Sequence, residues 1–422
     1  MNRRAQGSCR LVSAAAIGAL LLSGCSLLSG SDVTLKLVAA DYGDSDANSS
    51  KAYWEDLAHR FEAANPSVKV KVDVVSWTEI DKHVAELIKS GSTPDLVQTG
   101  GFADQVAAGR LYPAADVLSM ETQANLSENF THAGQVLGTQ YGIPWVASTR
   151  VFFYNKAIFQ KAGIAQPPAT WSELRQDADK IRAKVPGVVP YGLPLGSEEA
   201  QAESMMWAMS GGGSLSDDVG NYTIDSTQNV ATFDWLRTNL VETHDTYADP
   251  ATVNRKTAFG DFAAGKVAML NGHPSLLSVA AAANIDFGTA PIPRRDGVGR
   301  TGTLGVADWM MAFKANGHKT EIKSFLRLVY AKDSQLAFDE KYNLLPVTED
   351  TLEEMSANGK HEDLKQFLGA LPNASFYPLG DPAWEQVSAR IKAEIGKAAT
   401  GDARSVLGGL QEAAVAETKK VR

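Results

Sequence analysis

Beyond residue 32, the chain opens with a pattern that few folds allow: a strand, a helix and a second strand in quick succession. Residues 33–40 place apolar side chains at alternate positions, and residues 68–74 carry valine at every second position. Between them, residues 53–61 repeat apolar side chains at helical spacing. Two strands joined by a crossover helix pair in parallel. The pattern therefore predicts an α/β fold in which the ends of successive strands meet at one edge of a sheet.

Polar or aromatic side chains follow three successive strands of this predicted sheet. Residues 41–46 come directly after the first strand, Trp77 follows the second, and residues 95–99 form the third. Ser76 and Glu79 have capping-box spacing, which predicts a helix whose first residue is Trp77. Ligands of open α/β sheets bind beyond the carboxyl ends of the strands. We therefore expect one crevice to be lined by Asp41, Tyr42, Trp77, Gln98 and Thr99.

The amino terminus has the basic and then apolar pattern of a signal peptide. Three arginines precede residues 11–22, a run that is too short and too rich in alanine and serine to span a bilayer as a permanent helix. Residues 22–25 read Leu-Ser-Gly-Cys, the form of a bacterial lipobox. We predict a signal peptide at residues 1–24, a lipidated Cys25 with a tether to residue 32, and an extracytoplasmic protein anchored to the cell membrane. The alternative is a secreted protein that is cut elsewhere.

Cysteine usage and charge limit the mature chain further. Cys9 and Cys25 are the two cysteines of the sequence, so the predicted mature fold has no disulfide and depends on its core. About 390 of the 422 residues remain, which is enough for two domains. Loss of residues 1–24 removes three arginines and no acid, and the formal charge moves from -9 to -12. Such an acidic chain does not favour binding to nucleic acid or to an anionic membrane surface.

Three stretches match the motifs of one known family. Residues 141–156 combine Tyr-Gly-Ile-Pro with Tyr-Asn-Lys, residues 258–273 combine a short helix with Gly-Lys, Ala-Met and Asn-Gly-His, and residues 304–346 end in a leucine-proline turn. With these motifs the chain resembles the family 1 extracellular solute-binding proteins, the carbohydrate receptors of ABC importers. Weaker similarity covers nearly the whole mature chain.

The resemblance implies a fold as well as a role. It implies a two-lobe, periplasmic-binding-protein-like α/β fold with three interdomain crossings and a ligand cleft between the lobes. The expected N-terminal lobe comprises residues 33–146 and 308–350, and the expected C-terminal lobe comprises residues 147–307 and 351–422. The motif at residues 258–273 predicts a strand from Val267 to Leu270, followed by a polar turn at the sheet's edge.

The same resemblance adds residues to the expected ligand site. Ser148 stands where the family's maltose-binding members have a ligand-contacting glutamate, which argues against maltose specificity. Trp384 matches a sugar-stacking tryptophan. Aromatic rings suit the apolar face of a sugar, whereas amides and carboxylates suit its hydroxyl edge. The further candidates are Trp145, Glu203, Trp207, Asn271, His273, Asp308 and Trp309, while Trp54, Trp171 and Trp235 are expected in the core.

Other functions remain as alternatives. A glycosidase needs two carboxylates, and Asp41 with Asp308 or Glu203 is one conceivable pair. The sequence lacks nucleophile-elbow, zinc-protease and phosphate-loop motifs, and residues 41–46 lack the closing glutamate of a calcium loop. We predict no catalytic residue, no metal and no cofactor. A structural lipoprotein is an alternative of another class.

The predicted partners follow from this assignment. They are a small-molecule carbohydrate, the transmembrane subunits of an ABC permease and the membrane through the lipid on Cys25, with the protein itself a monomer. A polyol or a glycerophosphodiester is the second choice of ligand. Phosphate needs cationic partners, and Arg150 is the one arginine that the sequence places near the cleft.

Overall fold

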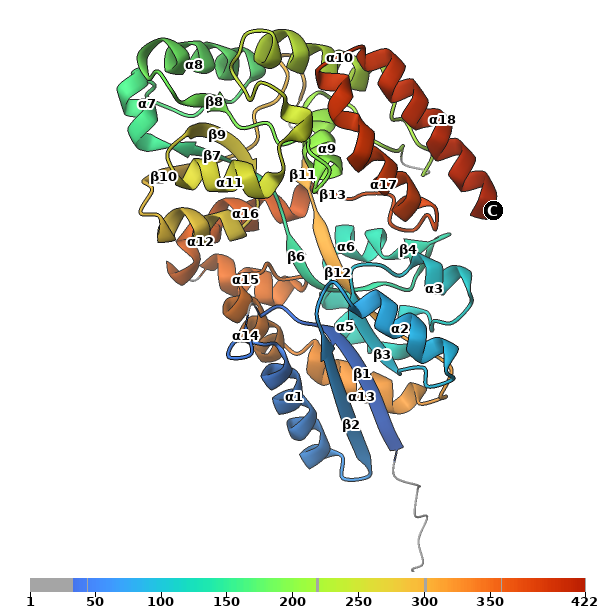
Figure 1. Ribbon diagram of the computed structural model, residues 1–422. Helices are drawn as coiled ribbons and strands as arrows, with labels where there is room; N and C mark the ends of the chain where they lie inside the picture. Colours follow the sequence, from blue (N-terminus) through green and yellow to red (C-terminus); the bar gives the residue numbers. More distant parts are fainter. Residues whose placement is uncertain (1–32, 44, 218–219, 300–301, 358, 422) are drawn as a thin grey trace, which may run out of the picture.

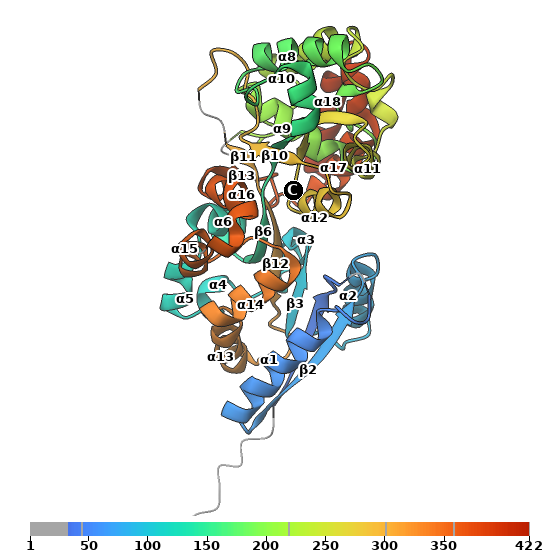
Figure 2. The ribbon, with the colours of Figure 1, turned by 90° about the vertical axis from the view of Figure 1, so that its left-hand side faces the viewer.

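The computed structural model describes residues 33–43, 45–217, 220–299, 302–357 and 359–421. The predicted signal peptide, Cys25 and the tether lie outside these residues. The described chain forms two α/β lobes, with β6 (Ile143–Ser148) and β12 (Val306–Ala312) running between them (Figures 1 and 2). No helix in these ranges is long and apolar enough to cross a membrane.

The N-terminal lobe is built on a five-stranded sheet of order β2-β1-β3-β12-β6. The three strands β1 (Val33–Ala40), β2 (Val68–Val75) and β3 (Leu96–Thr99) are parallel, as their sequence pattern predicts. β12 runs antiparallel to both β3 and β6. The register pairs Ala40 with Val75 and Ala39 with Gln98, so the three parallel strands end at one edge. The predicted meeting of strand ends is confirmed.

Helices cover this sheet and carry much of its core. The long helix α1 (Lys51–Ala64) buries Trp54, Leu57 and Phe61, the apolar face that the helical spacing predicts. The other helices of this lobe are α2 (Ile80–Lys89), α3 (Ala103–Ala107), α4 (Ala114–Val117), α5 (Met120–Asn125), α6 (Glu128–Ala133), α13 (Lys319–Val329) and α14 (Lys332–Tyr342). A hairpin of β4 (Gln135–Val136) and β5 (Thr139–Gln140) lies beside α6.

The C-terminal lobe is built on a four-stranded sheet of order β10-β7-β9-β8. Its strands are β7 (Val151–Asn155), β8 (Val189–Tyr191), β9 (Val267–Gly272) and β10 (Phe287–Ala290). Its helices are α7 (Lys156–Ala162), α8 (Trp171–Lys184), α9 (Ala200–Ser210), α10 (Thr227–Leu236) with a π-helical turn (Arg237–Val241), α11 (Arg255–Ala263), α12 (Ser275–Ala282), α17 (Trp384–Glu394) and α18 (Ala403–Val421). Short 3₁₀ segments lie at Pro250–Thr252, Gly359–Leu364, Leu371–Asn373 and Ile395–Ala399.

The chain passes between the lobes three times. The first passage joins β6 to β7, and the second joins β11 (Thr303–Leu304) to β12. The third runs through α15 (Glu349–Ala357) and α16 (Lys365–Ala370) to β13 (Ala374–Ser375), which pairs with β11. Phe367 of α16 contacts Phe153 of β7, with 6.0 Å between ring centroids. The three passages are therefore bonded or packed to one another.

Local sequence rules hold at some helix starts and fail at another. Thr170 and Glu173 form a full capping box at α8. The capping box predicted for Ser76 and Glu79 is wrong, because α2 begins at Ile80. The amide groups of Glu79 and Ile80 both donate to the Ser76 carbonyl, so these residues form a turn that leads into the helix. Trp77 lies in this turn.

The strand predicted at Val267–Leu270 is longer than expected. β9 continues to Gly272, because Asn271 and Gly272 pair with Phe152 and Val151 of β7. A Cβ atom at Gly272 would lie 2.8 Å from Leu276 and 2.9 Å from Phe153, so only glycine fits between strand and helix here. Asn271 is therefore held by the sheet rather than by a turn.

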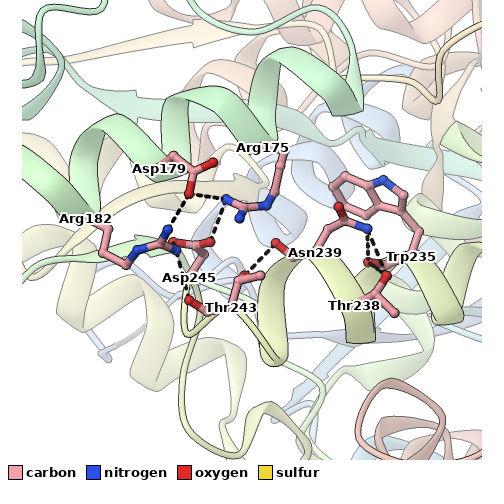
Figure 3. Close-up of polar contacts among 8 residues, drawn as sticks. All are labelled: Arg175, Asp179, Arg182, Trp235, Thr238, Asn239, Thr243 and Asp245. Carbon is pink, nitrogen blue, oxygen red and sulfur yellow. Dashed lines mark hydrogen bonds and ion pairs between the residues drawn. The ribbon is translucent and has the colours of Figure 1, made fainter.

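A buried ion-pair cluster joins α8 to the segment after α10 (Figure 3). Asp245 is fully buried, and its two carboxylate oxygens lie 2.9 Å from Arg175 and 2.5 Å from Arg182. The backbone carbonyl of Asp245 accepts a hydrogen bond from the amide of Tyr191, the last residue of β8. The cluster thus fixes the edge of the C-terminal sheet.

The β4–β5 hairpin carries a strained apolar residue at its tip. Leu137 has φ +50° and Gly138 has φ +78°, and the Leu137 side chain is fully exposed. Residues other than glycine, asparagine and aspartate are destabilised by roughly 1 kcal/mol in this left-handed region. We expect Leu137→Asn to raise the free energy of unfolding by about 0.5 to 1 kcal/mol in a denaturant titration.

Leu137→Ala is the matched control, because it removes the apolar side chain but keeps the backbone strain. It should not stabilise the protein. Equal effects of alanine and asparagine would contradict the strain argument.

Candidate ligand-binding site

A directed chain of hydrogen bonds lies at the strand-end edge of the N-terminal lobe. Gln98 accepts from the Ala40 amide at 3.1 Å and donates to the Tyr42 hydroxyl at 2.9 Å. Tyr42 donates in turn to Oδ2 of Asp308 at 2.6 Å. Burial raises the pKa of Asp308 to about 6, although the Tyr42 hydrogen bond opposes this shift. The chain orients one carboxylate at the start of β12.

An exposed tryptophan stands next to this chain. The Trp77 ring packs edge-on against Tyr42 with 5.4 Å between centroids, yet 40% of Trp77 stays exposed. The other face of Tyr42 is held by Phe338 at 5.0 Å. Trp77 thus offers an aromatic surface beside a hydrogen-bonded carboxylate, the combination that a sugar ring needs.

The β6–β12 ribbon carries polar groups from one lobe to the other. Asp308 pairs with Val146, and Ser148 pairs with Val306 two residues further along. Residues two apart in a strand point to the same face and lie roughly 7 Å apart. Arg150, just past Ser148, donates to the Ser148 hydroxyl at 3.0 Å. The Asp308 carboxylate and the hydroxyl that a buried arginine contacts therefore lie on the same face of the ribbon.

A buried glutamate lies in the wall of the C-terminal lobe. Oε1 of Glu203, on α9, accepts from Trp207 Nε1 at 2.8 Å, from the Tyr191 hydroxyl at 3.3 Å and from Asn271 Nδ2 at 3.3 Å. Glu203 is only 3% exposed. Burial raises its pKa to about 8, against the effect of these three hydrogen bonds. Glu203 is therefore mostly protonated at neutral pH.

Arginines and glutamates alternate beside Glu203. Arg150 lies 3.0 Å from Glu199, the other oxygen of Glu199 lies 2.5 Å from Arg255, and Arg255 also lies 2.7 Å from Glu198. We call these four residues the Arg–Glu ladder. Three ladder residues, Arg150, Glu199 and Arg255, line a small pocket that is partly open to solvent, together with Glu203, Asn271 and His273.

His273 is neutral at the end of this ladder. A guanidinium only donates, so Nε2 of His273 accepts from Arg255 at 2.6 Å, and Nδ1 carries the proton that is donated to Ser275 at 3.0 Å. Burial, with Arg150 and Arg255 nearby, lowers the pKa of His273 well below its usual value. The ladder and His273 together carry two positive and two negative charges.

The region before α17 adds two stacked rings. Trp384 stacks on Tyr377 with 4.9 Å between centroids and 23° between planes. Burial raises the pKa of Tyr377, whose hydroxyl is buried without a partner in the described chain and feels the charges of Arg150 and Glu199. The half-buried Trp384 therefore packs on Tyr377, which lies close to Arg150 and Glu199 of the ladder.

The structure places several predicted site residues away from this surface. Trp145 and Trp309 are fully buried, against Trp54 at 4.9 Å and Phe102 at 5.1 Å. They offer no face to a ligand, and the site proposed below omits them. Trp207 is also buried and acts through its bond to Glu203.

Two polar predictions have partners within the protein. Asp41 accepts hydrogen bonds from Gly43, Ser49 and Ser50, which outweigh the effect of burial and lower its pKa. Thr99 is 5% exposed and donates to Asp81 at 2.9 Å. Both bonds hold loops or helices in place, so the proposed site omits these residues too.

Sequence reasoning also missed residues that the fold brings together. Arg255 is a second arginine at the pocket, so the expectation of Arg150 alone was wrong. Glu198, Glu199 and Tyr377 were missed as well. The double acid just before α9 was a usable signal, but its pairing with Arg255 depends on a contact across more than fifty residues. Across the described ranges, no group of three or more His, Cys, Asp or Glu side chains is placed to hold a metal ion.

Comparison with known proteins agrees with this architecture. The structure matches the cyclic α-maltosyl-1,6-maltose binding protein of Arthrobacter globiformis with a TM-score of 0.78 at 18% identity, covering 92% of this chain and 99% of that one. In sequence, a Brucella abortus protein described only as a candidate binding protein is 30% identical over 87% of this chain and 90% of its own. The sn-glycerol-3-phosphate-binding periplasmic protein of Rhizobium meliloti is 24% identical over 75% and 79%.

The fold is that of the two-lobe periplasmic binding proteins. Residues 45–336 match the family model of the bacterial extracellular solute-binding proteins, and the chain belongs to that family. It is a solute-binding protein of the type that serves ABC importers, and the family works outside the cytoplasm. The resemblance and the two-lobe fold predicted from the sequence are confirmed.

Proposed function

We propose that the protein captures a mono- or oligosaccharide in a cleft between its lobes and delivers it to the transmembrane subunits of an ABC permease. One observation carries this proposal: two hydrogen-bonded pairs, Tyr42 with Asp308 and Arg150 with Ser148, lie on the same face of the β6–β12 ribbon that runs between the lobes. A ligand that contacts both pairs stabilises one arrangement of the lobes by its differential affinity.

The aromatic surface favours a sugar among small solutes. Trp77 is exposed beside Asp308's hydrogen-bond partner, and Trp384 with Tyr377 lies beside the ladder. The proposed site comprises Tyr42, Trp77, Gln98, Ser148, Glu203, Asn271, His273, Asp308 and Trp384. A polyol or glycerophosphodiester is the second candidate, supported by the name of the Rhizobium relative.

The surroundings of the three candidate carboxylates support ligand binding rather than catalysis. Asp41 is engaged by its own loop, while Asp308 and Glu203 belong to different lobes and are each hydrogen-bonded by tyrosine. We propose that these carboxyl groups hold ligand hydroxyls and cleave no bond.

We also propose lipid anchoring through Cys25, a monomeric state and lobe boundaries near residues 146, 307 and 350. They rest on the sequence pattern at residues 22–25 and on the crossings.

A thermal-melt screen of the protein from Ser26 onward tests the ligand class. The panel is maltose, cellobiose, diacetylchitobiose, methyl α-glucoside, glycerol and sn-glycerol 3-phosphate. A ligand at about 100 times its dissociation constant adds roughly 2.7 kcal/mol to the free energy of unfolding. We expect a clear upward shift with at least one sugar. A normal melt that no sugar shifts would contradict the proposal.

Trp77→Ala should weaken sugar binding about tenfold or more, because an exposed aromatic anchor is lost. The melting temperature without ligand should fall only modestly, because Trp77 packs against Tyr42 but 40% of it is exposed. Met120→Ala is the control: Met120 is 87% exposed on α5, and its loss should leave affinity unchanged in calorimetric titrations. Unchanged affinity of Trp77→Ala would remove Trp77 from the site.

A further inference from the structure

Glu203 and Asn271 line the pocket of the C-terminal lobe, and the hydrogen bonds to Glu203 all end on one of its two carboxylate oxygens. Three donors converge on Oε1 of Glu203, from Trp207, Tyr191 and Asn271. An oxygen that accepts three hydrogen bonds has no room for a proton of its own. A proton on Glu203 therefore sits on Oε2, where it is available as a donor.

Asn271 supplies the complementary group. Its Nδ2 is used in the bond to Glu203, which fixes the orientation of the amide. Its Oδ1 is buried and has no hydrogen-bond partner among the described residues. A buried acceptor without a donor destabilises the protein, so a ligand that donates a hydrogen bond to it gains affinity. Glu203 and Asn271 thus present one donor and one acceptor side by side.

The charges around this pair are already balanced. Arg150 is paired with Glu199, and Arg255 is paired with Glu199 and Glu198. His273 accepts from Arg255 and is neutral. An incoming phosphate would have to displace a glutamate from an arginine, and it offers few protons for the Asn271 oxygen. A hydroxyl group needs neither change, because it donates and accepts at once.

We propose that Glu203 and Asn271 together bind one hydroxyl group of an uncharged, polyhydroxylated ligand, and that the Arg–Glu ladder beside them disfavours a phosphate-bearing one. This inference rests on the proposed function and narrows it to neutral sugars and polyols. Glu203 donates through Oε2 to the ligand oxygen, and that hydroxyl donates to Oδ1 of Asn271.

The titration of Glu203 gives this arrangement a measurable signature. The charged and titratable groups around it are Tyr191 of β8, Glu199 just before α9, Arg150 after β6, Arg255 of α11 and His273 after β9, with Tyr377 beside Arg150 and Glu199. Burial raises the pKa of both tyrosines above 10, and the pKa of His273 is well below 6.5. Among the shifted pKa values given for this group of residues, that of Glu203, at about 8, lies between pH 7 and 9.

The test is calorimetric titration at pH 6.5 and pH 9 with the panel sugar that gives the largest melt shift, and with sn-glycerol 3-phosphate. Wild-type affinity for the sugar should fall about tenfold at pH 9, because ionised Glu203 loses its donor. Glu203→Gln keeps an N–H donor at this position but has no proton that titrates, so its affinity should be the same at pH 6.5 and at pH 9. Asn271→Leu should weaken binding about tenfold or more at both values.

Each outcome decides something. Wild-type affinity that stays flat with pH, or that falls equally in Glu203→Gln, overturns the inference and leaves a sugar receptor. Tighter binding of sn-glycerol 3-phosphate than of any sugar also overturns it. If no sugar binds a normally folded protein, the proposed function fails and the inference with it. Should Asn271→Leu not fold, the comparison of wild type with Glu203→Gln still decides.

Discussion

Asp245→Ala is expected to lower the free energy of unfolding by about 3 kcal/mol, because it leaves two arginines without their shared buried carboxylate. Asp245 is fully buried between Arg175 and Arg182, whose side chains are 21% and 42% exposed. Because both arginines are partly exposed, water can solvate their charges after the substitution. We therefore expect a loss of stability at the low end of the range for a broken buried ion pair. Urea titration followed by tryptophan fluorescence measures it.

The chain offers a matched control for this substitution. Asp234 and Arg237 form an exposed pair at 3.5 Å, with Asp234 48% exposed. Such pairs contribute roughly 0 to 1 kcal/mol, so Asp234→Ala should change stability little. Similar losses for Asp245→Ala and Asp234→Ala would contradict the view that the buried cluster in Figure 3 holds the lobe together.

Glu203→Gln should stabilise the unliganded protein by about 3 kcal/mol at pH 7. The pKa of Glu203 is raised from 4.5 to about 8 in the folded protein. Below pH 4.5 both states are protonated and the substitution is neutral. Between pH 4.5 and 8 only the unfolded chain ionises, so the stability of wild type falls as pH rises. Glutamine removes this loss, and the difference levels off above pH 8.

Urea titrations of both proteins at pH 5, 7 and 9 measure the difference. The exposed Glu353 of α15 provides the control, since Glu353→Gln removes a surface carboxylate and should change stability little. A difference between wild type and Glu203→Gln that is the same at all three pH values would show that Glu203 is ionised in the folded protein throughout.

The sequence was most informative where local periodicity decides structure. Alternating valines and an amphipathic helix determine the parallel start of the N-terminal sheet, and they place Tyr42, Trp77 and Gln98 at one edge. The Asn155 cap of α7 and the Thr170 capping box follow from neighbouring residues, and both are present. Crossings were recognised by family motifs rather than by pattern.

Predictions failed where both sides of a segment are apolar or where partners are distant in sequence. β6 is buried on both faces, so alternation could not show that Trp145 points into the core. The end of β9 depends on pairing with β7, which no local rule specifies. The ladder depends on an Arg255–Glu198 contact that exists only in the folded lobe. Long-range pairing, not local propensity, builds this part of the site.

The bonded passages between the lobes limit how the molecule can deform. β6 and β12 are hydrogen-bonded to each other with a bulge between Asp308 and Trp309, and β13 is bonded to β11. Sliding one lobe sideways would break these ladders, whereas flexing at the bulge keeps them. We therefore expect the lobes to rearrange mainly by flexing at this bulge. Fluorophores on α2 and α11 would report two discrete separations in single-molecule energy transfer, rather than a continuum.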